Sequence, residues 1–408
     1  MPPTNFHFRR RPVKESLPNN PEELFFDLRT RDPTIEHLWS HQADILRNYY
    51  SDRLNSEDLA IELPTGSGKT LVGLLIGEFR RIVNKQRVLY LCPTRQLVHQ
   101  VHEKSKQYGI KAHAFIGKQS EYVTEEFNQY LNGEAIAIST YSSLFNTRPR
   151  FNDPKIIICD DAHGAEQYIA SMWSLNINRF DDSDVFWKTF SLFEDILPTE
   201  FCEIVRDNNP ALLRKLIVEK VPIPYFVDRL DNLRACLNEN IHKEKPNLFY
   251  PMSIVRENLI ACNMYISWSE ILIRPWIPPT LTHLPFNNAT QRIYMSATLG
   301  EGGELERIIG VPKIERIPVP IGWDKRGSGR RYFVFPDYKY KWDEYIEFVT
   351  EQVKKQNRTL ILCSNRMTAD MVKEHLQRLG VSHQFLSSYD IEDSLEPFTS
   401  EDKKIWYC

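Results

Sequence analysis

The segment of the sequence most suited to chemistry is Leu63–Thr70, which reads Leu-Pro-Thr-Gly-Ser-Gly-Lys-Thr. It follows an apolar strand-like run and opens an apolar helix-like run, which is the context of a phosphate-binding loop. Glycines let backbone N–H groups converge on phosphate oxygens, and the start of a helix adds its positive dipole end. Lys69 is expected to neutralise the β- and γ-phosphates of ATP, and the Thr70 hydroxyl to hold Mg²⁺. The residues expected to bind ATP in this loop are Thr65, Gly66, Ser67, Gly68, Lys69 and Thr70.

A second chemical cluster, Cys159–His163, follows the apolar run 155–158. Its two adjacent carboxylates suit coordination of Mg²⁺ by Asp160 and activation of a water molecule by Asp161. Acidic residues after a strand also cap helices, and that is the alternative for this pair. The phosphate-binding loop upstream favours the catalytic interpretation.

Short apolar runs alternate with amphipathic stretches around these two motifs. The expected strands are Leu59–Glu62, Arg87–Cys92, Ala135–Ser139, Lys155–Cys159 and Arg292–Met295. Such runs, separated by helices, predict an α/β fold with a parallel sheet covered on both faces. Ligands bind at the carboxyl ends of the strands in sheets of this kind, and both motifs follow a strand.

Together, the two motifs resemble motifs I and II of the DEAD/DEAH-box superfamily 2 helicases. Four further segments match the family in its order: Trp39–Gln42, Pro93–Gln100, Ser139–Tyr141 and Ser296–Thr298. The resemblance implies a RecA-like P-loop domain in which Gln42 contacts adenine. It also implies that Thr94, Arg95 and Thr140 contact nucleic acid, and that Ser296 and Thr298 couple hydrolysis to strand movement.

The sequence departs from the family pattern at three places. Asp161 stands where the family usually has Glu, so the carboxylate is one methylene shorter. A long aromatic-rich segment, expected to be mainly helical, separates motif II from motif III and resembles the insertion of the DinG/XPD-like branch. That branch often carries an iron–sulfur cluster between motifs Ia and II, but no cysteine lies between Val101 and Ile158, so no cluster is expected there.

The third departure concerns the C-terminal part. A second alternating unit begins near Arg331 and predicts a partial second RecA-like domain, but the sequence reaches Cys408 before motifs V and VI. Motif VI supplies arginine fingers, which are worth about 10³ to 10⁵ in rate. We therefore expect this chain to bind ATP and to hydrolyse it poorly, unless a protein partner or a downstream chain completes the site.

The predicted organisation has four parts. An irregular segment covers 1–30, RecA-like domain 1 covers 31–164 and 291–325, the insertion covers 165–290, and the partial second domain covers 326–408. The net charge of −3 excludes an overall basic field, so binding of nucleic acid would rely on local patches. No run approaches the roughly 20 apolar residues of a membrane span. The seven scattered cysteines indicate an intracellular location, cytoplasmic or, in a eukaryote, nuclear.

The sequence thus predicts an ATP-dependent nucleic-acid helicase or translocase that uses ATP and Mg²⁺, with DNA favoured over RNA. The alternative is a regulatory or scaffolding subunit that binds ATP without turning it over. The missing motifs and Asp161 favour the alternative, whereas the intact phosphate loop and motif III favour the enzyme.

Overall fold

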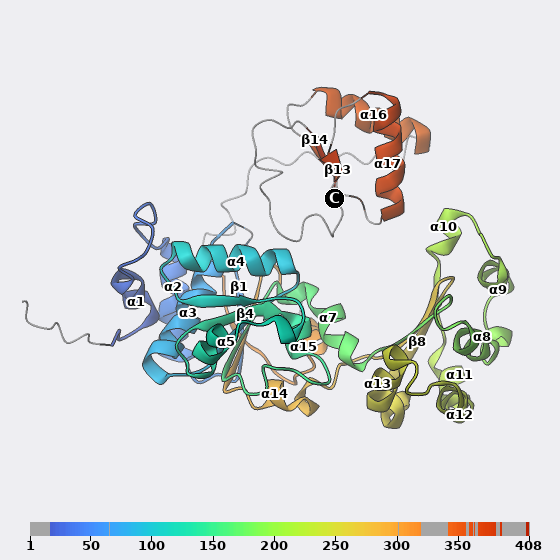
Figure 1. Cartoon of the computed structure of the whole chain (residues 1–408), viewed down its shortest axis with the longest axis horizontal. Coiled ribbons are helices and arrows are strands. Elements are labelled where there is room, and N and C mark those ends of the chain that lie inside the picture. Colours follow the sequence, from blue (N-terminus) through green and yellow to red (C-terminus); the bar gives the residue numbers. More distant parts are fainter. Residues whose placement is uncertain are drawn as a thin grey trace, which may run out of the picture.

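The computed structural model describes residues 17–64, 66–300, 302–319, 342–355, 359–361, 363, 366–380, 384–385 and 405–407. Figure 1 shows an α/β domain around a central sheet, an insertion beside it, and a small C-terminal unit. None of the described helices has the length and apolar character needed to cross a bilayer.

Seven parallel strands form the central sheet, in the order β11-β1-β10-β5-β2-β4-β3. Their bounds are β1 Asp58–Glu62, β2 Val88–Cys92, β3 Ala112–Phe115, β4 Ile136–Thr140, β5 Ile156–Asp160, β10 Gln291–Ser296 and β11 Glu315–Ile317. The five predicted strands are confirmed to within a residue or two at each end. The two edge strands, β3 and β11, were not predicted. The predicted α/β, RecA-like fold class is confirmed.

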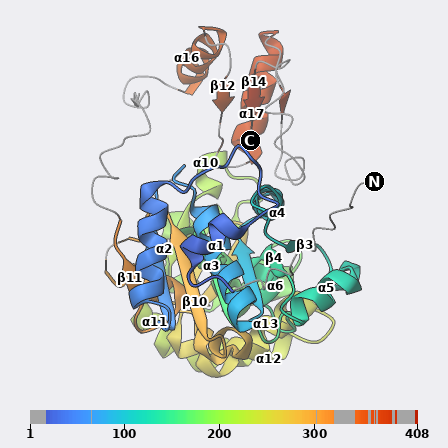
Figure 2. The same ribbon diagram turned by 90° about the vertical axis from the view of Figure 1, so that its left-hand side faces the viewer.

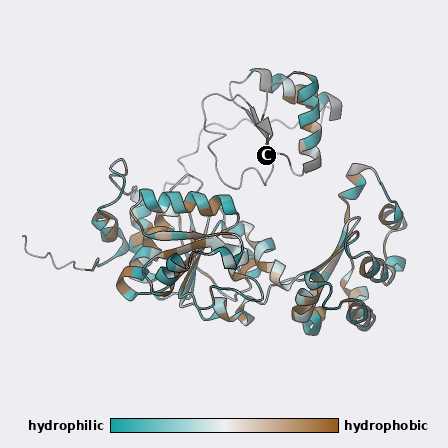
Figure 3. Ribbon diagram, in the orientation of Figure 1, coloured by the Kyte–Doolittle hydropathy of each residue, from teal (hydrophilic) through white to brown (hydrophobic). Residues whose placement is uncertain are grey.

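Helices cover both faces of this sheet, as predicted for buried parallel strands. One face packs on α1 Pro21–Asp27, α2 Ser40–Asp52, α3 Lys69–Asn84 and α4 Arg95–Gln107. The other face packs on α5 Thr124–Leu131, α6 Tyr141–Leu144, α7 Glu166–Ala170, α14 Leu284–Asn287 and α15 Glu304–Ile309. In Figure 2, α1, α2 and α3 lie together on the side facing the viewer. Figure 3 shows the brown, apolar segments concentrated in the strands between these helices.

Two glycines let α3 approach the sheet closely. A Cβ added at Gly73 would lie 2.6 Å from the Cε of Met295, and one at Gly77 would lie 3.0 Å from a methyl group of Val88. Because α3 begins at Lys69, this close packing fixes the start of the helix at the carboxyl edge of the sheet.

The insertion contains an antiparallel sheet in the order β6-β9-β8-β7, which the sequence analysis did not predict. The strands are β6 Leu175–Asn178, β7 Val218–Lys220, β8 Cys262–Ser267 and β9 Glu270–Pro275. The helices are α8 Ser183–Ser191, α9 Thr199–Arg206, α10 Leu212–Lys215, α11 Ile223–Asp228, α12 Leu230–Asn240 and α13 Pro246–Val255. The segment was expected to be mainly helical, and β7 interrupts its helices between α10 and α11.

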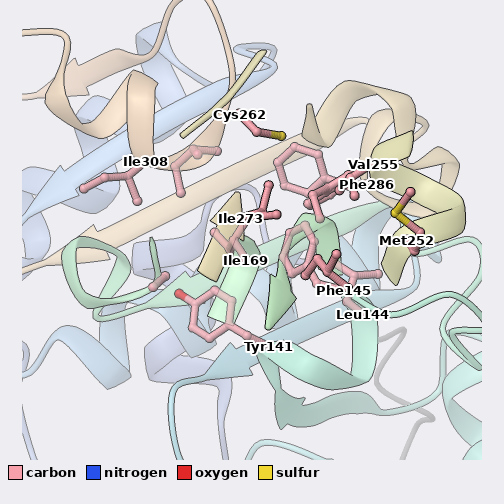
Figure 4. Close-up of a cluster of buried hydrophobic side chains, with 14 of the residues drawn as sticks. Tyr141, Leu144, Phe145, Ile169, Met252, Val255, Cys262, Ile273, Phe286 and Ile308 are labelled. Atoms are coloured by element: carbon pink, nitrogen blue, oxygen red, sulfur yellow. The ribbon is translucent and has the colours of Figure 1, made fainter. Parts of the chain in front are cut away.

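The insertion and the central domain share one apolar core. Ile273 of β9 and Met252 of α13 belong to the same buried cluster as Leu144 of α6 and Ile308 of α15. Figure 4 shows these side chains converging from both parts of the chain. The insertion is therefore packed onto the central domain rather than attached only by its two connecting segments.

The C-terminal unit contains α16 Trp342–Lys355, β12 Thr359–Ile361, α17 Arg366–Arg378, β13 Gln384–Phe385 and β14 Ile405–Tyr407. Its three strands are parallel, in the order β12-β14-β13. Ile346, Val372 and Leu376 form its described core. The start of the predicted second alternating unit, near Arg331, lies outside the described residues.

Candidate active site at the carboxyl edge of the sheet

The sheet order brings three of the predicted motifs together. Strand β10 lies between β1 and β5, and all three run in the same direction. Three features therefore meet at the carboxyl edge of the sheet: the loop after β1, the carboxylates at the end of β5, and Ser296 at the end of β10. Strands β2 and β4 continue the same edge, so Thr94 and Thr140 lie on the side away from β1.

The phosphate loop turns through glycines in the left-handed conformation. Gly66 has φ of +83° and Gly68 has φ of +80°, values that other residues adopt at a cost. Helix α3 begins at Lys69, so the free N–H groups of its first turn, including that of Thr70, face the loop. Ser67 is fully buried and donates a hydrogen bond of 2.6 Å to the carbonyl of Pro64. Thr65 lies outside the described residues.

The side chain of Gln42 is hydrogen-bonded to the phosphate loop. Its Nε2 donates to the carbonyl of Ser67 at 3.0 Å, and its Oε1 accepts from the backbone N–H of Trp39 at 3.0 Å. A Cβ on Gly68 would lie only 2.2 Å from this Nε2, so the loop leaves no room there for a side chain. His41 also donates to the Ser67 carbonyl, at 2.9 Å. His41 and this positioning role of Gln42 were not predicted from the sequence, and contact of Gln42 with adenine stays a prediction.

Lys69 and Asp161 form an ion pair across the site. The Nζ of Lys69 lies 2.5 Å from Oδ1 of Asp161, with side chains that are 14% and 36% exposed. Asp161 has φ of +48°, the left-handed conformation, which turns the chain sharply after β5. Asp and Asn tolerate this conformation better than most residues, and the sequence pattern gave no sign of it.

Asp160 is the buried member of the acidic pair. Burial, followed by the neighbouring charge of Asp161, raises the pKa of its carboxyl to about 6, although Lys69 opposes this rise. The backbone N–H of Asp161 donates to its Oδ1 at 3.1 Å. A divalent cation beside Asp160 would favour its ionised form.

Two contacts connect the acidic pair to neighbouring motifs. Nδ1 of His163 is hydrogen-bonded to Oγ of Ser296, which also accepts from the backbone N–H of Thr298 at 3.2 Å. The hydroxyl of Tyr141, which is fully buried, donates to the carbonyl of Asp160 at 2.8 Å. His163 and Tyr141 were not predicted as site residues, although both stand inside quoted motifs.

The predicted nucleic-acid contacts lie at the ends of β2 and β4. Thr94 is exposed and caps α4 by accepting the N–H of Leu97 at 3.3 Å. Arg95 is exposed at the first position of that helix, and Thr140 is half-buried before α6. The structure brings Thr94, Arg95 and Thr140 to the same edge as the phosphate loop but not into contact with the acidic pair.

Comparison with known proteins finds a family match over part of the chain. Residues 39–185 match the family model of the DEAD/DEAH box helicases, a range that includes the phosphate loop and the acidic pair. Residues 39–185 form a DEAD/DEAH box helicase domain. The match ends inside the insertion, within α8.

Two curated relatives align with parts of this chain. The ATP-dependent DNA helicase Hel308 of Thermococcus kodakarensis is 24% identical over 133 residues, which is 32% of this chain and 11% of Hel308. The DEAD-box ATP-dependent RNA helicase CshC of Bacillus cereus is 30% identical over 88 residues, which is 20% of this chain and 23% of CshC. The matches thus span less than a quarter of either relative.

Solved structures share the fold over a longer range. A structure named XPD_Helicase has a TM-score of 0.51 and 17% identity, covering 91% of this chain and 80% of that chain. The structure of S. tokodaii Xpd4 has the same TM-score with 16% identity, covering 90% of this chain and 80% of that one. The likeness therefore extends beyond the helicase domain to the arrangement of most of the chain.

Proposed function

We propose that this chain is an ATP-dependent motor that moves on or unwinds nucleic acid, with DNA as the favoured partner. The observation that carries the proposal is the meeting of the phosphate loop, the acidic pair and Ser296 at one edge of the sheet. Among the two curated matches, the longer one is to a DNA helicase. In the proposed organisation, 165–290 is an insertion into the first RecA-like domain, and 326–408 is part of a second one.

ATP would bind with its phosphates over the start of α3. Lys69 would leave Asp161 and neutralise the β- and γ-phosphates, which frees the Asp161 carboxylate to accept a proton from the attacking water. Gln42 would hold the loop in shape and contact adenine at its rim. His163, Ser296 and Thr298 would transmit the change to β10, and Thr94, Arg95 and Thr140 would hold the strand.

The residues at this edge also suit Mg²⁺. The described residues contain no group of three or more His, Cys, Asp or Glu that could hold a metal by themselves. Magnesium at an ATP site needs only one or two protein oxygens, because phosphates and water complete its shell. Thr70 and Asp160 would supply these oxygens, and the ion would offset charge on the phosphates.

The test is release of phosphate from ATP by the full chain, with and without single-stranded DNA or RNA. A motor shows a rate that nucleic acid stimulates and that Lys69→Ala abolishes, whereas Lys243→Ala, at an exposed lysine of the insertion, leaves it unchanged. Stimulation by DNA but not by RNA supports the favoured partner. A Lys69→Ala variant with the wild-type rate would sink the proposal.

A second candidate is an ATP-binding subunit that does not turn ATP over alone. The Lys69–Asp161 ion pair and the short Asp161 side chain favour it, because both keep the catalytic carboxylate away from a water molecule on phosphate. It predicts ATP binding that Lys69→Ala removes, without phosphate release under any of the conditions above.

A further inference from the structure

One face of the insertion sheet is not part of its apolar core. Residues of β8 and β9 alternate, so that Met264 and Ile273 point inward and are fully buried. The alternate residues of β8 and β9, and Lys220 of β7 beside Tyr265, point the other way. Lys220, Tyr265, Leu272, Arg274 and Trp276 are here called the open face, and Glu270 lies at its far end on β9. Figure 1 shows α8 and α12 close together beside this sheet.

The open face carries aromatic rings beside cations. Trp276 is 54% exposed, and its ring centroid lies 5.5 Å from the Nζ of Lys220 and 5.1 Å from the guanidinium of Arg307. Lys220 also lies 5.9 Å from the ring of Tyr265. Among the described residues, no carboxylate forms an ion pair with Lys220, so its charge is available to a ligand.

Around Trp276, the three cations Lys220, Arg274 and Arg307 outnumber the two carboxylates that act on the arginines. Arg274 and Arg307 share one carboxylate, Glu166, at 2.8 and 3.0 Å, and the charge of Glu304 on α15 also acts on Arg307. Lys220 adds the third cation. An exposed aromatic ring in a positive field favours a ligand with flat rings and negative charges.

The open face adjoins the nucleic-acid side of the helicase domain. Tyr168 of α7 stacks on Tyr141, which directly follows Thr140, with ring centroids 6.2 Å apart. Glu166, on the same helix, holds Arg307 over Trp276. A nucleic-acid strand that contacts Thr140 and follows α7 would therefore reach Trp276.

We propose that the open face binds single-stranded nucleic acid, with Trp276 and Tyr265 stacking on bases and Lys220 contacting the phosphate backbone. This inference rests on the proposed function and extends the strand beyond Thr94, Arg95 and Thr140. The stacking contact favours a single strand over duplex, because unpaired bases stack freely on aromatic rings, whereas paired bases must first be unstacked from each other.

The test is binding of a fluorescent oligo-dT strand to the full chain, followed by anisotropy, beside an abasic strand of equal length and charge. Wild type binds oligo-dT more tightly than the abasic strand. Trp276→Ala weakens binding of oligo-dT by about 5- to 150-fold, the range for loss of one stacking ring, and removes the preference. Trp276→Phe keeps the preference for oligo-dT over the abasic strand.

Two further variants separate the contacts. Lys220→Ala lowers the slope of log affinity against log salt by about 0.7, the value for one phosphate contact on a single strand. Tyr225→Ala, at a ring of α11 that is 48% exposed, is the matched control and keeps wild-type affinity. Equal losses in Tyr225→Ala and Trp276→Ala would overturn the inference.

The outcomes also distinguish this inference from the proposed function. Equal binding of oligo-dT and abasic strand, together with wild-type affinity in Trp276→Ala, overturns the open face as a stacking site. The motor survives that result if DNA still stimulates phosphate release. If the chain neither binds the oligonucleotides nor releases phosphate faster with DNA, both the open face as a binding site and the proposed motor function are overturned.

Discussion

We expect Asp161→Asn to bind ATP more tightly than wild type while hydrolysing it more slowly. Lys69 is held by Asp161 at 2.5 Å, so ATP must break this ion pair before its phosphates can contact the lysine. Asn has nearly the shape of Asp and tolerates the left-handed conformation at this position. The variant therefore removes the charge with little change to the backbone.

The magnitude follows from the exposure of the pair. Exposed ion pairs contribute about 0.2–1 kcal/mol, and breaking a buried pair costs about 3–5 kcal/mol. Lys69 is 14% exposed, but Asp161 is 36% exposed, so solvent screens the pair and the estimate is about 1–2 kcal/mol. This corresponds to ATP affinity about 5- to 30-fold higher in Asp161→Asn. Loss of the general base lowers kcat by about 10²-fold or more.

The assay measures ATP affinity by anisotropy of a fluorescent nucleotide, and kcat by phosphate release. Asp161→Glu is the matched control, because it keeps the charge and should bind ATP within a few-fold of wild type. An Asp161→Asn affinity equal to or weaker than that of wild type would refute the competition between Asp161 and ATP. Unchanged kcat in that variant would refute the role of Asp161 as a base.

Three further outcomes are expected. Arg292→Met removes the two hydrogen bonds of 2.6 and 2.7 Å that the arginine donates to the buried Asp58 carboxylate. Urea unfolding should therefore show a free energy of unfolding lower by about 3–5 kcal/mol. A decrease below about 1 kcal/mol would contradict this. Gly77→Ala places a methyl group 3.0 Å from a side chain of β2 and should lower stability by about 1–3 kcal/mol, whereas unchanged stability would show that α3 can shift. Burial lowers the pKa of His283, which donates to the carbonyl of Leu144 at 2.8 Å. The unfolded chain therefore binds more protons, so the contribution of this group is complete above its unfolded pKa of about 6.5 and is lost as pH falls below it. Wild type should lose more stability than His283→Gln between pH 7 and 5, and parallel curves would contradict this assignment.

The sequence was sufficient to predict how the site is assembled but not its internal contacts. Parallel strands predict that Lys69 and Asp160 meet at one edge, because every strand end lies on the same side. The ion pair between Lys69 and Asp161 joins residues 92 positions apart and depends on the left-handed turn at Asp161. No local pattern specifies that turn, because Asp is also common in ordinary loops and caps.

The edge strands and the insertion sheet were missed for a related reason. Strand β3 has four residues with a polar His113 among them, and β11 has three, so neither forms an apolar run. In the insertion, β8 contains Asn263 and Tyr265 between buried residues, which weakens the apolar signal of a strand. Aromatic density in this region instead suggested helices. The pairing that stabilises β8 comes from β9, and propensity alone does not reveal a partner.

The contacts of Glu166 join the insertion to the helicase domain. This carboxylate lies three residues after His163 and binds Arg274 of β9 and Arg307 of α15, so one group joins the segments after motif II and motif III to the insertion sheet. The apolar core shown in Figure 4 adds a buried apolar contact between the insertion and the helicase domain. Packed cores resist small continuous deformation, so a shift of His163 or Ser296 would displace the insertion sheet together with the domain. A nucleic-acid strand bound to the open face would therefore move together with the carboxyl edge of the central sheet. The elements that bind ATP would then determine how this nucleic acid moves.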